Sequence, residues 1–535
     1  MSVSVQVSGG DPGGGVGLDG VAARLVDKDA TLWGAAAADL ASERLGWLDL
    51  PESSQALIPQ LRELRDRLHA AGLDRVVLAG MGGSSLAPEV ITRTAGVDLT
   101  ILDSTDPHQV GAALADRIEA TVLVVASKSG GTVETDSHRR AFEKAFRDAG
   151  FTDSELAARI VVVTDPGSPL HEEATAAGYE VVLADPDVGG RYSALSAFGI
   201  TPSYLAGADV ERLLADARVL AGELADDGNP GMVLGAALGE QAAAGRDKLV
   251  LADAGSGIVG FGEWAEQLVA ESTGKEGKGI LPVVVEGIDA AGFVDAGPDA
   301  HLVVLGSGRP GVDATAVHGS LGAQFLLWEY ATAVAGLVLG INPFDQPNVA
   351  ESKENTQKIL DEAGDGPLPE GEPVLVDGAV EVHGDLEALG GSTDLAGVLR
   401  GVAALVPPRG YLAVMAYLDR GADSAAAGIR ARLAQVAADR PVTFGWGPRF
   451  LHSTGQLHKG GPPVGVFLQV TGAVVSDVDV PGRPFTFGRL EMAQALGDQR
   501  ALSGRGRPVV RLHLTDRGAG VQQLLDAATR AGSAS

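Results

Sequence analysis

Short runs of consecutive apolar residues, each followed by small polar residues and then a helical pattern, recur through the first third of this chain. The first four runs are residues 75–80, 98–102, 121–126 and 159–163. Strands that are apolar throughout and alternate with helices indicate a parallel sheet covered by helices on both faces. Such a doubly wound α/β sheet binds its ligands beyond the carboxyl ends of the strands. The pattern therefore predicts both the fold class and the edge where a ligand site lies.

A second α/β set begins near residue 230, and 535 residues are enough for two or three domains. Its apolar runs are residues 248–252, 301–305, 410–416, 442–445 and 464–470. We therefore expect two doubly wound parallel-sheet domains and a C-terminal extension. The expected boundaries are a flexible leader at 1–22, a first domain at 23–220, a second domain at 221–505 with a surface insertion near 364–392, and a C-terminal segment at 506–535.

The charge and composition exclude several classes of protein. Asp and Glu number 70 against 41 Lys and Arg, a net charge of −29, which opposes nucleic-acid binding. The chain has no cysteine, so disulfides and thiolate metal sites are excluded. No apolar run reaches the ~20 residues of a membrane span, and the first 20 residues do not have the pattern of a signal peptide. We expect a cytoplasmic protein that binds neither nucleic acid nor membrane.

The turn Ser127-Lys-Ser-Gly-Gly-Thr132 has the composition of a phosphate-binding loop. It offers three hydroxyls, one ammonium, and glycines that allow backbone N–H groups to approach an anion at a helix N-terminus. An ordinary helix cap needs only one hydroxyl and no lysine. The turn Gly82-Gly-Ser84 is a weaker signal of the same kind, because glycine-rich turns are common between strands and helices.

The stretch from Trp264 to Lys275 is the expected place of the chemistry. A helical pattern runs into Glu271 and stops at Ser-Thr-Gly, an ending typical of helix C-termini. The negative end of the helix dipole disfavours an ionised carboxylate there, which favours a role as general base. A solvated surface glutamate is the alternative. Arg191, which lies among small residues, is either a substrate contact or a surface arginine.

Two further patterns bear on cofactors. The stretch Gly255-Ser-Gly-Ile-Val-Gly260 formally matches a dinucleotide fingerprint, but no acidic residue ends a following strand about 20 residues on. His452 and His458 share a Gly/Ser/Thr-rich loop and lack a third metal ligand nearby. We therefore expect neither a cofactor nor a metal.

Taken together, five motifs resemble those of phosphoglucose isomerases, in the same order along the chain. The likeness is strongest to bacterial forms, including the isomerase half of fused transaldolase–phosphoglucose isomerases. The motifs are Met81-Gly-Gly-Ser84, Ser127-Lys-Ser-Gly-Gly-Thr-Val-Glu-Thr135, Gly189-Gly-Arg-Tyr-Ser193 with its continuation to Gly199, Gln267 to Lys275, and Ile341-Asn-Pro-Phe-Asp-Gln346 with Lys353.

The resemblance implies two sugar-isomerase (SIS) domains of flavodoxin-like topology. It also implies reversible conversion of glucose 6-phosphate to fructose 6-phosphate, a step of glycolysis and gluconeogenesis, through a cis-enediol and without a cofactor. A homodimer is implied as well. In this comparison Glu271 shuttles the proton, Arg191 stabilises the enediolate, and Lys353 assists ring opening. Substrate and phosphate contacts fall on Gly82, Gly83, Ser84, Ser127, Lys128, Ser129, Thr132 and Gln267.

The ring-opening histidine departs from the family pattern. His318 lies in the family's usual interval but lacks its Gly-Gln-His context, so we favour the loop that contains His452 and His458 and leave the choice between them open. Two alternative functions also remain. A phosphomannose or dual-specificity isomerase would share the base and the phosphate loop, and a non-catalytic SIS-domain sensor would not need the base.

Overall fold

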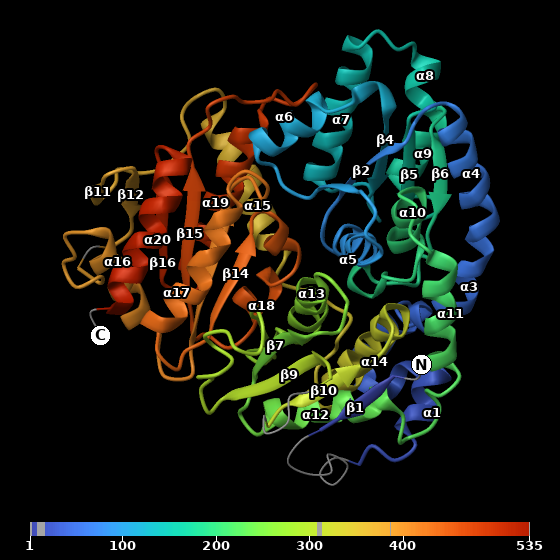
Figure 1. Cartoon of the computed structure of the whole chain (residues 1–535), viewed down its shortest axis with the longest axis horizontal. Helices are drawn as coiled ribbons and strands as arrows, with labels where there is room; N and C mark the ends of the chain where they lie inside the picture. The colour runs from blue at the N-terminus through green and yellow to red at the C-terminus, as the bar shows by residue number, and fades with distance from the viewer. Residues whose placement is uncertain (1–2, 8–16, 308–312, 386, 534–535) are drawn as a thin grey trace.

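The computed structural model describes residues 3–7, 17–307, 313–385 and 387–533. Within these residues the strands form three sheets, two of five strands and one of six. The three sheets lie around the middle of the molecule, with the first at the upper right of Figure 1, the second below it and the third at the left. The predicted α/β class with mainly parallel sheets is confirmed.

The first unit, residues 58–221, contains a five-stranded parallel sheet in the order β3-β2-β4-β5-β6. This is the 2-1-3-4-5 winding of flavodoxin-like folds, in which ligands bind where the strand order reverses. The predicted apolar runs form its strands, and residues of β2, β4 and β5 are buried throughout. The strands are β2 (Arg75–Gly80), β3 (Thr100–Leu102), β4 (Thr121–Ala126), β5 (Ile160–Thr164) and β6 (Glu180–Leu183), and the helices are α4 (Ile58–Ala70), α5 (Leu86–Ala95), α6 (Pro107–Ala115), α7 (Val133–Asp148), α8 (Asp153–Ala157), α9 (Pro169–Ala177), α10 (Ala197–Leu205) and α11 (Val210–Ala221).

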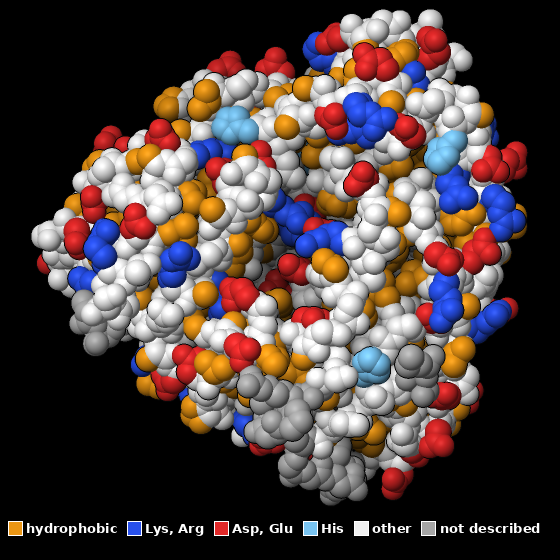
Figure 2. All heavy atoms as spheres, viewed as in Figure 1, with side chains coloured by type: hydrophobic (Ala, Val, Ile, Leu, Met, Phe, Trp, Pro, Cys, Tyr) orange, Lys and Arg blue, Asp and Glu red, His pale blue; other side chains and the backbone are white. Residues whose placement is uncertain are grey.

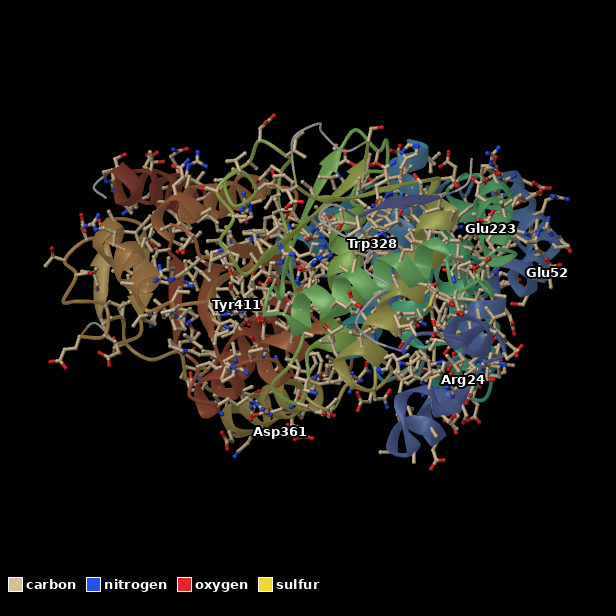
Figure 3. The ribbon with its side chains drawn as sticks, turned by 90° about the horizontal axis from the view of Figure 1, so that it is seen from below. Arg24, Glu52, Glu223, Trp328, Asp361 and Tyr411 are labelled. Carbon is tan, nitrogen blue, oxygen red and sulfur yellow. The ribbon has the colours of Figure 1, made fainter. Side chains whose placement is uncertain are left out.

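The second unit, residues 230–339, repeats this winding in the parallel order β8-β7-β9-β10. Its strands are β7 (Lys248–Ala254), β8 (Leu281–Val284), β9 (Ala300–Gly306) and β10 (Thr315–His318), and its helices are α12 (Pro230–Ala243), α13 (Phe261–Thr273) and α14 (Leu321–Leu339). Helix α14 has the length and apolarity of a membrane span, but 83% of it is buried inside the protein. Its Trp328 lies within the molecule, whereas Glu52 and Glu223 lie at the periphery (Figure 3). Helix α14 is therefore a core helix.

The predicted flexible leader is partly an edge strand. Strand β1 (Ser4–Gln6) pairs antiparallel with β10 and extends the second sheet. Val3 is buried, and Val5 packs against the core, which explains why this alternating segment adds to the sheet edge. Residues 1–2 and 8–16 of the leader lie outside the described residues. The segment continues into α1 (Val21–Val26), α2 (Ala35–Ser42) and α3 (Leu50–Ser53).

The third unit, residues 375–533, has a sheet of its own. Strands expected in the second domain pair with the hairpin of the predicted insertion and with a strand of the predicted C-terminal segment. Sequence periodicity locates strands but does not reveal which strands pair, so this sheet was not expected from the sequence. The sheet order is β11-β12-β16-β15-β13-β14, and β14-β13-β15-β16 again has the 2-1-3-4 winding. The strands are β11 (Leu375–Asp377), β12 (Val380–His383), β13 (Tyr411–Tyr417), β14 (Val442–Trp446), β15 (Gly465–Gly472) and β16 (Val509–Leu514), and the helices are α16 (Leu395–Ala404), α17 (Ile429–Val436), α18 (Gly455–Gly460), α19 (Phe487–Gly504) and α20 (Arg517–Ser533).

Apolar clusters join the third unit to the other two. One cluster combines Val283 of the second sheet with Met415 and Phe467 of the third. Another combines residues of α6 and α7 with α19 and with α15 (Ala350–Ala363), the helix that connects the second and third units. The third unit therefore packs against both neighbours through buried side chains. The expected domain boundaries remain a prediction.

Candidate active site

One glycine lies where the three units meet. Gly82 begins the short 3₁₀ helix Gly82–Ser84 at the carboxyl end of β2, at the point where the strand order reverses. Its φ is +56°, and a Cβ there would lie 2.7 Å from Gln267 Nε2 and 2.8 Å from the carbonyl oxygen of His452. Gln267 belongs to α13 of the second unit, and His452 belongs to the third. Only glycine fits this junction.

We expect Gly82→Ala to lower the free energy of unfolding by about 1–3 kcal/mol and to reduce activity, because the methyl group would push apart Gln267 and His452. Gly96→Ala is a matched control, since Gly96 has a φ of +67° but no atom within 4 Å of the position that a Cβ would take. Urea unfolding and steady-state kinetics on both variants measure the difference. Equal losses of stability and activity in the two variants would show that backbone strain, and not the contacts with Gln267 and His452, causes the effect.

Glu271 lies in the last turn of α13, as predicted from the sequence, and it is 8% exposed. Its two carboxylate oxygens face different partners. Gln267 donates a hydrogen bond to Oε2 at 3.1 Å, and Arg191 Nη1 lies 3.4 Å from Oε1. The structure therefore brings three predicted site residues together around one buried carboxylate.

Arg191 is buried and held in a fixed orientation. Its Nε donates to Ser272 Oγ at 2.8 Å, and its Nη1 donates to Gln346 Oε1 at 2.7 Å. Its Nη2 donates to the carbonyl oxygens of Pro343 and Asp345. Because a guanidinium has five N–H groups, one Nη1 hydrogen remains on the side of Glu271. Arg191 can thus present a fixed positive charge to a reacting group beside that carboxylate.

Lys275 supports the same segment rather than the reacting centre. Its Nζ donates to the carbonyl oxygens of Asn342 and Asp345 and pairs with Asp345 Oδ1 at 2.6 Å. Burial lowers the pKa of Lys275 to about 8, and the nearby Arg191 charge acts in the same direction. The loop that carries Gln346 is therefore anchored from two sides.

The predicted phosphate loop follows β4 and leads into the N-terminus of α7. Ser127 Oγ accepts a hydrogen bond from the Gly130 backbone N–H and donates one to Thr132 Oγ1, and Ser129 Oγ accepts one from the Gly131 N–H. Lys128 is oriented differently, since its Nζ pairs with Asp165 at 2.6 Å and donates to the carbonyl oxygen of Pro186. The hydroxyls and the helix N-terminus lie at the site, while the Lys128 ammonium is bound elsewhere.

A pocket of about 200 Å³ opens between this loop, α15, α19 and the turn after β14. The hollow at the centre of Figure 2, with Lys and Arg side chains in it, corresponds to the region where the units meet. Besides apolar groups, the lining of the pocket between this loop, α15 and α19 includes Gly131, Glu134, Lys353, His452 and Gln494. The pocket therefore combines the phosphate loop with two predicted ring-opening groups, Lys353 and His452.

Two residues of this pocket, Glu134 and Gln494, were not predicted from the sequence. His452 Nε2 lies 3.0 Å from Glu134 Oε1, and Gln494 Nε2 donates to the same oxygen at 2.7 Å. Burial would raise the pKa of Glu134, but the neighbouring His452 outweighs it and lowers that pKa to about 2. Glu134 was present in the quoted Thr-Val-Glu-Thr motif, which was a usable signal. No sequence signal pointed to Gln494, because it lies 360 residues further along the chain than Glu134.

The structure separates His458 from the pocket. Its ring is buried among Tyr411, Phe450 and Phe467, with ring centroids 5.0–6.2 Å apart. Burial lowers the pKa of His458 well below its ordinary value, so the ring is neutral. Of the two histidines in this loop, His452 is the one that lines the pocket.

Comparisons with known proteins point to one family. The phosphoglucose isomerase family model matches residues 65–228. The glucose-6-phosphate isomerase of Rubrobacter xylanophilus is 30% identical over 423 residues, a match that covers 64% of this chain and 96% of the relative. A probable glucose-6-phosphate isomerase from Haloarcula marismortui is 35% identical over 222 residues, covering 40% and 49%. Among solved structures, a hypothetical protein from Thermus thermophilus aligns with a TM-score of 0.53 at 25% identity, over 63% of this chain and 96% of that one.

The parallel sheets, the hydroxyl-rich loop and the buried carboxylate beside an arginine define an α/β isomerase that acts on a sugar phosphate. The chain belongs to the phosphoglucose isomerase family.

Proposed function

We propose that this chain interconverts glucose 6-phosphate and fructose 6-phosphate through a cis-enediol, with Glu271 carrying the proton between C1 and C2. A single carboxylate first removes a proton from one carbon and then returns it to the next, so it acts as both base and acid. The buried position of Glu271, between Gln267 and Arg191, supports this role because both neighbours hold the carboxylate in place and Arg191 puts a cation beside it.

The phosphate group binds at the 127–132 loop in this proposal. Ser127, Ser129 and Thr132 supply hydroxyls, and the first backbone N–H groups of α7 point to the same place. Lys128 contributes through its backbone, since its ammonium pairs with Asp165. Binding energy from the phosphate positions the sugar carbons, which do not themselves provide strong contacts.

Ring opening is assigned to His452, with Lys353 nearby and Glu134 behind it. A histidine that moves a proton between the ring oxygen and the C1 hydroxyl needs a fixed orientation. The hydrogen bond between His452 Nε2 and Glu134 Oε1 supplies that orientation, and Glu134 is ionised beside the ring.

Arg191 stabilises the enediolate in this mechanism. The negative charge that develops on the C1 and C2 oxygens needs a cation that does not reorganise during the reaction. Arg191 is already held in place by four hydrogen bonds. No redox chemistry is required for this isomerisation.

The single observation that carries the proposal is the contact of Arg191 with the buried carboxylate of Glu271. The test is conversion of fructose 6-phosphate to glucose 6-phosphate in D₂O by the wild-type enzyme with a chelator present. A proton shuttle places solvent deuterium at C2 of the product, because the carboxyl proton exchanges before it returns. Product without any deuterium would indicate a hydride shift instead. Turnover of mannose 6-phosphate in the same assay would favour the dual-specificity alternative.

A further inference from the structure

The ligand-binding edge of the third sheet is occupied by the first unit. In doubly wound sheets this edge is formed by the carboxyl ends of the parallel strands. In the third unit, Arg420 follows β13, Arg449 follows β14 and Arg517 follows β16. All three arginines form ion pairs with carboxylates of the first unit. This edge therefore serves as a contact with the first unit.

The contact next to the pocket histidine in sequence is a cluster of four charges, of which Glu89, Asp103 and Arg449 are buried. Arg449 lies 2.5 Å from Glu89 and 2.6 Å from Asp103, and Arg420 lies 2.6 Å from Glu89 and 3.3 Å from Asp103. Burial would raise the pKa of Glu89, but Arg449 and Arg420 lower it to about 2. Glu89 is therefore ionised at neutral pH. Breaking a buried pair by removing one partner is strongly unfavourable, so these charges fix the two units relative to each other.

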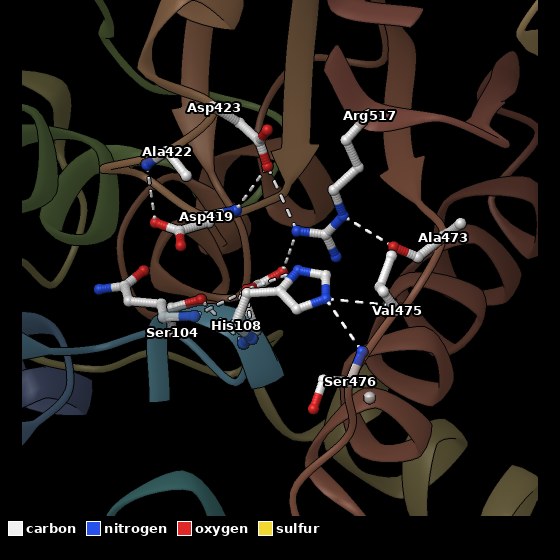
Figure 4. A network of polar contacts seen from close by, with 12 residues as sticks. Ser104, His108, Asp419, Ala422, Asp423, Ala473, Val475, Ser476 and Arg517 are labelled. Atoms are coloured by element: carbon white, nitrogen blue, oxygen red, sulfur yellow. Dashed lines mark hydrogen bonds and ion pairs between the residues drawn. The ribbon is translucent and has the colours of Figure 1, made fainter. Parts of the chain in front are cut away.

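A second contact joins the third unit to the start of α6 (Figure 4). Arg517 pairs with Asp106 of the first unit at 2.6 Å and with Asp423 of its own unit at 3.2 Å, and it donates to the carbonyl oxygen of Ala473. The backbone N–H of Val475 donates to His108 Nε2 at 3.1 Å. The loops after β15 and β16 thus hold the start of α6, and the loop after β13 holds Arg517 through Asp423.

The same contact brings third-unit side chains into the active-site pocket. Arg449 begins the 3₁₀ helix Arg449–His452, so the residue held by Glu89 and Asp103 is three positions from the pocket histidine. Gln494 of α19 bridges Thr105 and Glu134 of the first unit. The carbonyl oxygen of His452 accepts a hydrogen bond from Gln267 of the second unit.

The match to a family relative leaves part of this chain unmatched. The match to the Rubrobacter xylanophilus isomerase takes up 96% of that protein but only 64% of this chain. About a third of this chain therefore lies outside that match.

We propose that the third unit completes the active site within the same chain, and that Arg449 is a positioning residue which places His452 against Glu134. The inference rests on the ring-opening role proposed for His452. Each chain then contains a whole site, whatever assembly it forms, and the homodimer expected from the family resemblance is not needed for activity.

Complementation between two inactive variants tests the first statement. Glu271→Gln and His452→Asn chains with different tags are co-expressed, and the mixed material is isolated and assayed at several dilutions. We expect no activity above that of the separate variants, because no chain carries both groups. If copies exchanged their histidines, a mixed dimer would regain one intact site, or about a quarter of wild-type activity in a random mixture. That recovery would overturn the inference.

The single variants show which statement fails, the ring-opening role of His452 or the completion of the site within one chain. If His452→Asn alone keeps wild-type activity, the ring-opening role fails and the inference fails with it. If both single variants are impaired and the mixture recovers, the proposed function stands and only completion within one chain is wrong.

The positioning role is tested with Glu89→Gln and substrate deuterated at C2. We expect kcat to fall about 10-fold or more, and the C2 isotope effect to fall toward one as ring opening becomes rate-limiting. Asp423→Asn, which weakens the second contact, is the matched control and should leave the isotope effect unchanged. Should Glu89→Gln fail to fold, Arg449→Lys gives the same readout while keeping the charge. Loss of activity with an unchanged isotope effect would mean that the charge cluster around Glu89 has only a structural role.

Discussion

Replacing Glu271 by glutamine is expected to lower kcat at least ~10²-fold while substrate binding persists. Glutamine has the same shape and can still accept the hydrogen bond from Gln267, but it cannot take up a proton. The phosphate loop and the pocket around His452 are unchanged by this substitution. Steady-state kinetics combined with a direct binding measurement therefore separates chemistry from binding.

The ring-opening step gives a sharper form of the same prediction. Opening and closing the sugar ring interconverts the two anomers without any proton transfer at C2. We therefore expect Glu271→Gln to keep anomer interconversion, measured by NMR, and to lose deuterium exchange at C2. Glu263→Gln on the exposed side of the same helix is the matched control and should retain both. If Glu271→Gln retains exchange at C2, the proton shuttle is a different group.

Replacing Arg191 by lysine is expected to lower kcat by about 10²–10³-fold, in the range found when one stabilising donor of a developing anion is removed. Lysine keeps the charge but cannot reproduce the planar fork. It would lose most of the simultaneous contacts with Ser272, Gln346 and the Pro343 carbonyl oxygen. The charge would then no longer be fixed beside Glu271.

Two measurements separate this effect from general damage. The exposed Arg212→Lys on α11 is a control that should behave as wild type in kinetics and in urea unfolding. For Arg191→Lys we expect the loss in kcat to exceed any change in KM, because the interaction strengthens as the enediolate forms. A change confined to KM would mean that Arg191 binds the substrate without stabilising the intermediate.

The sequence was informative wherever local chemistry decides the structure. Residues such as Ser127 and Gly82 lie directly after apolar strands, and a parallel sheet brings the ends of its strands to one edge. Glu271 could be placed at a helix end because Ser-Thr-Gly is a local stop signal. These residues could be predicted because strand and helix ends depend on neighbours in sequence.

The third sheet could not be predicted in the same way. Strand β16 pairs with β12 on one side and β15 on the other, and no local pattern records such pairings. Without this sheet, the contact between Gln494 and Glu134 could not be foreseen, nor could the choice of His452 over His458. That choice depends on whether a side chain faces the pocket or the aromatic core of the third unit, which only packing decides.

The position of the pocket wall in the chain has a consequence for biosynthesis. The phosphate loop and α13 are made first, whereas His452, Gln494 and strand β16 emerge from the ribosome late. The loop at residues 127–132 can fold with its own sheet, but the pocket closes only after the last strand of the third sheet has been inserted. The nascent enzyme therefore remains incomplete until residue 514 has been translated, and a product truncated before β16 keeps its 127–132 loop without a finished pocket.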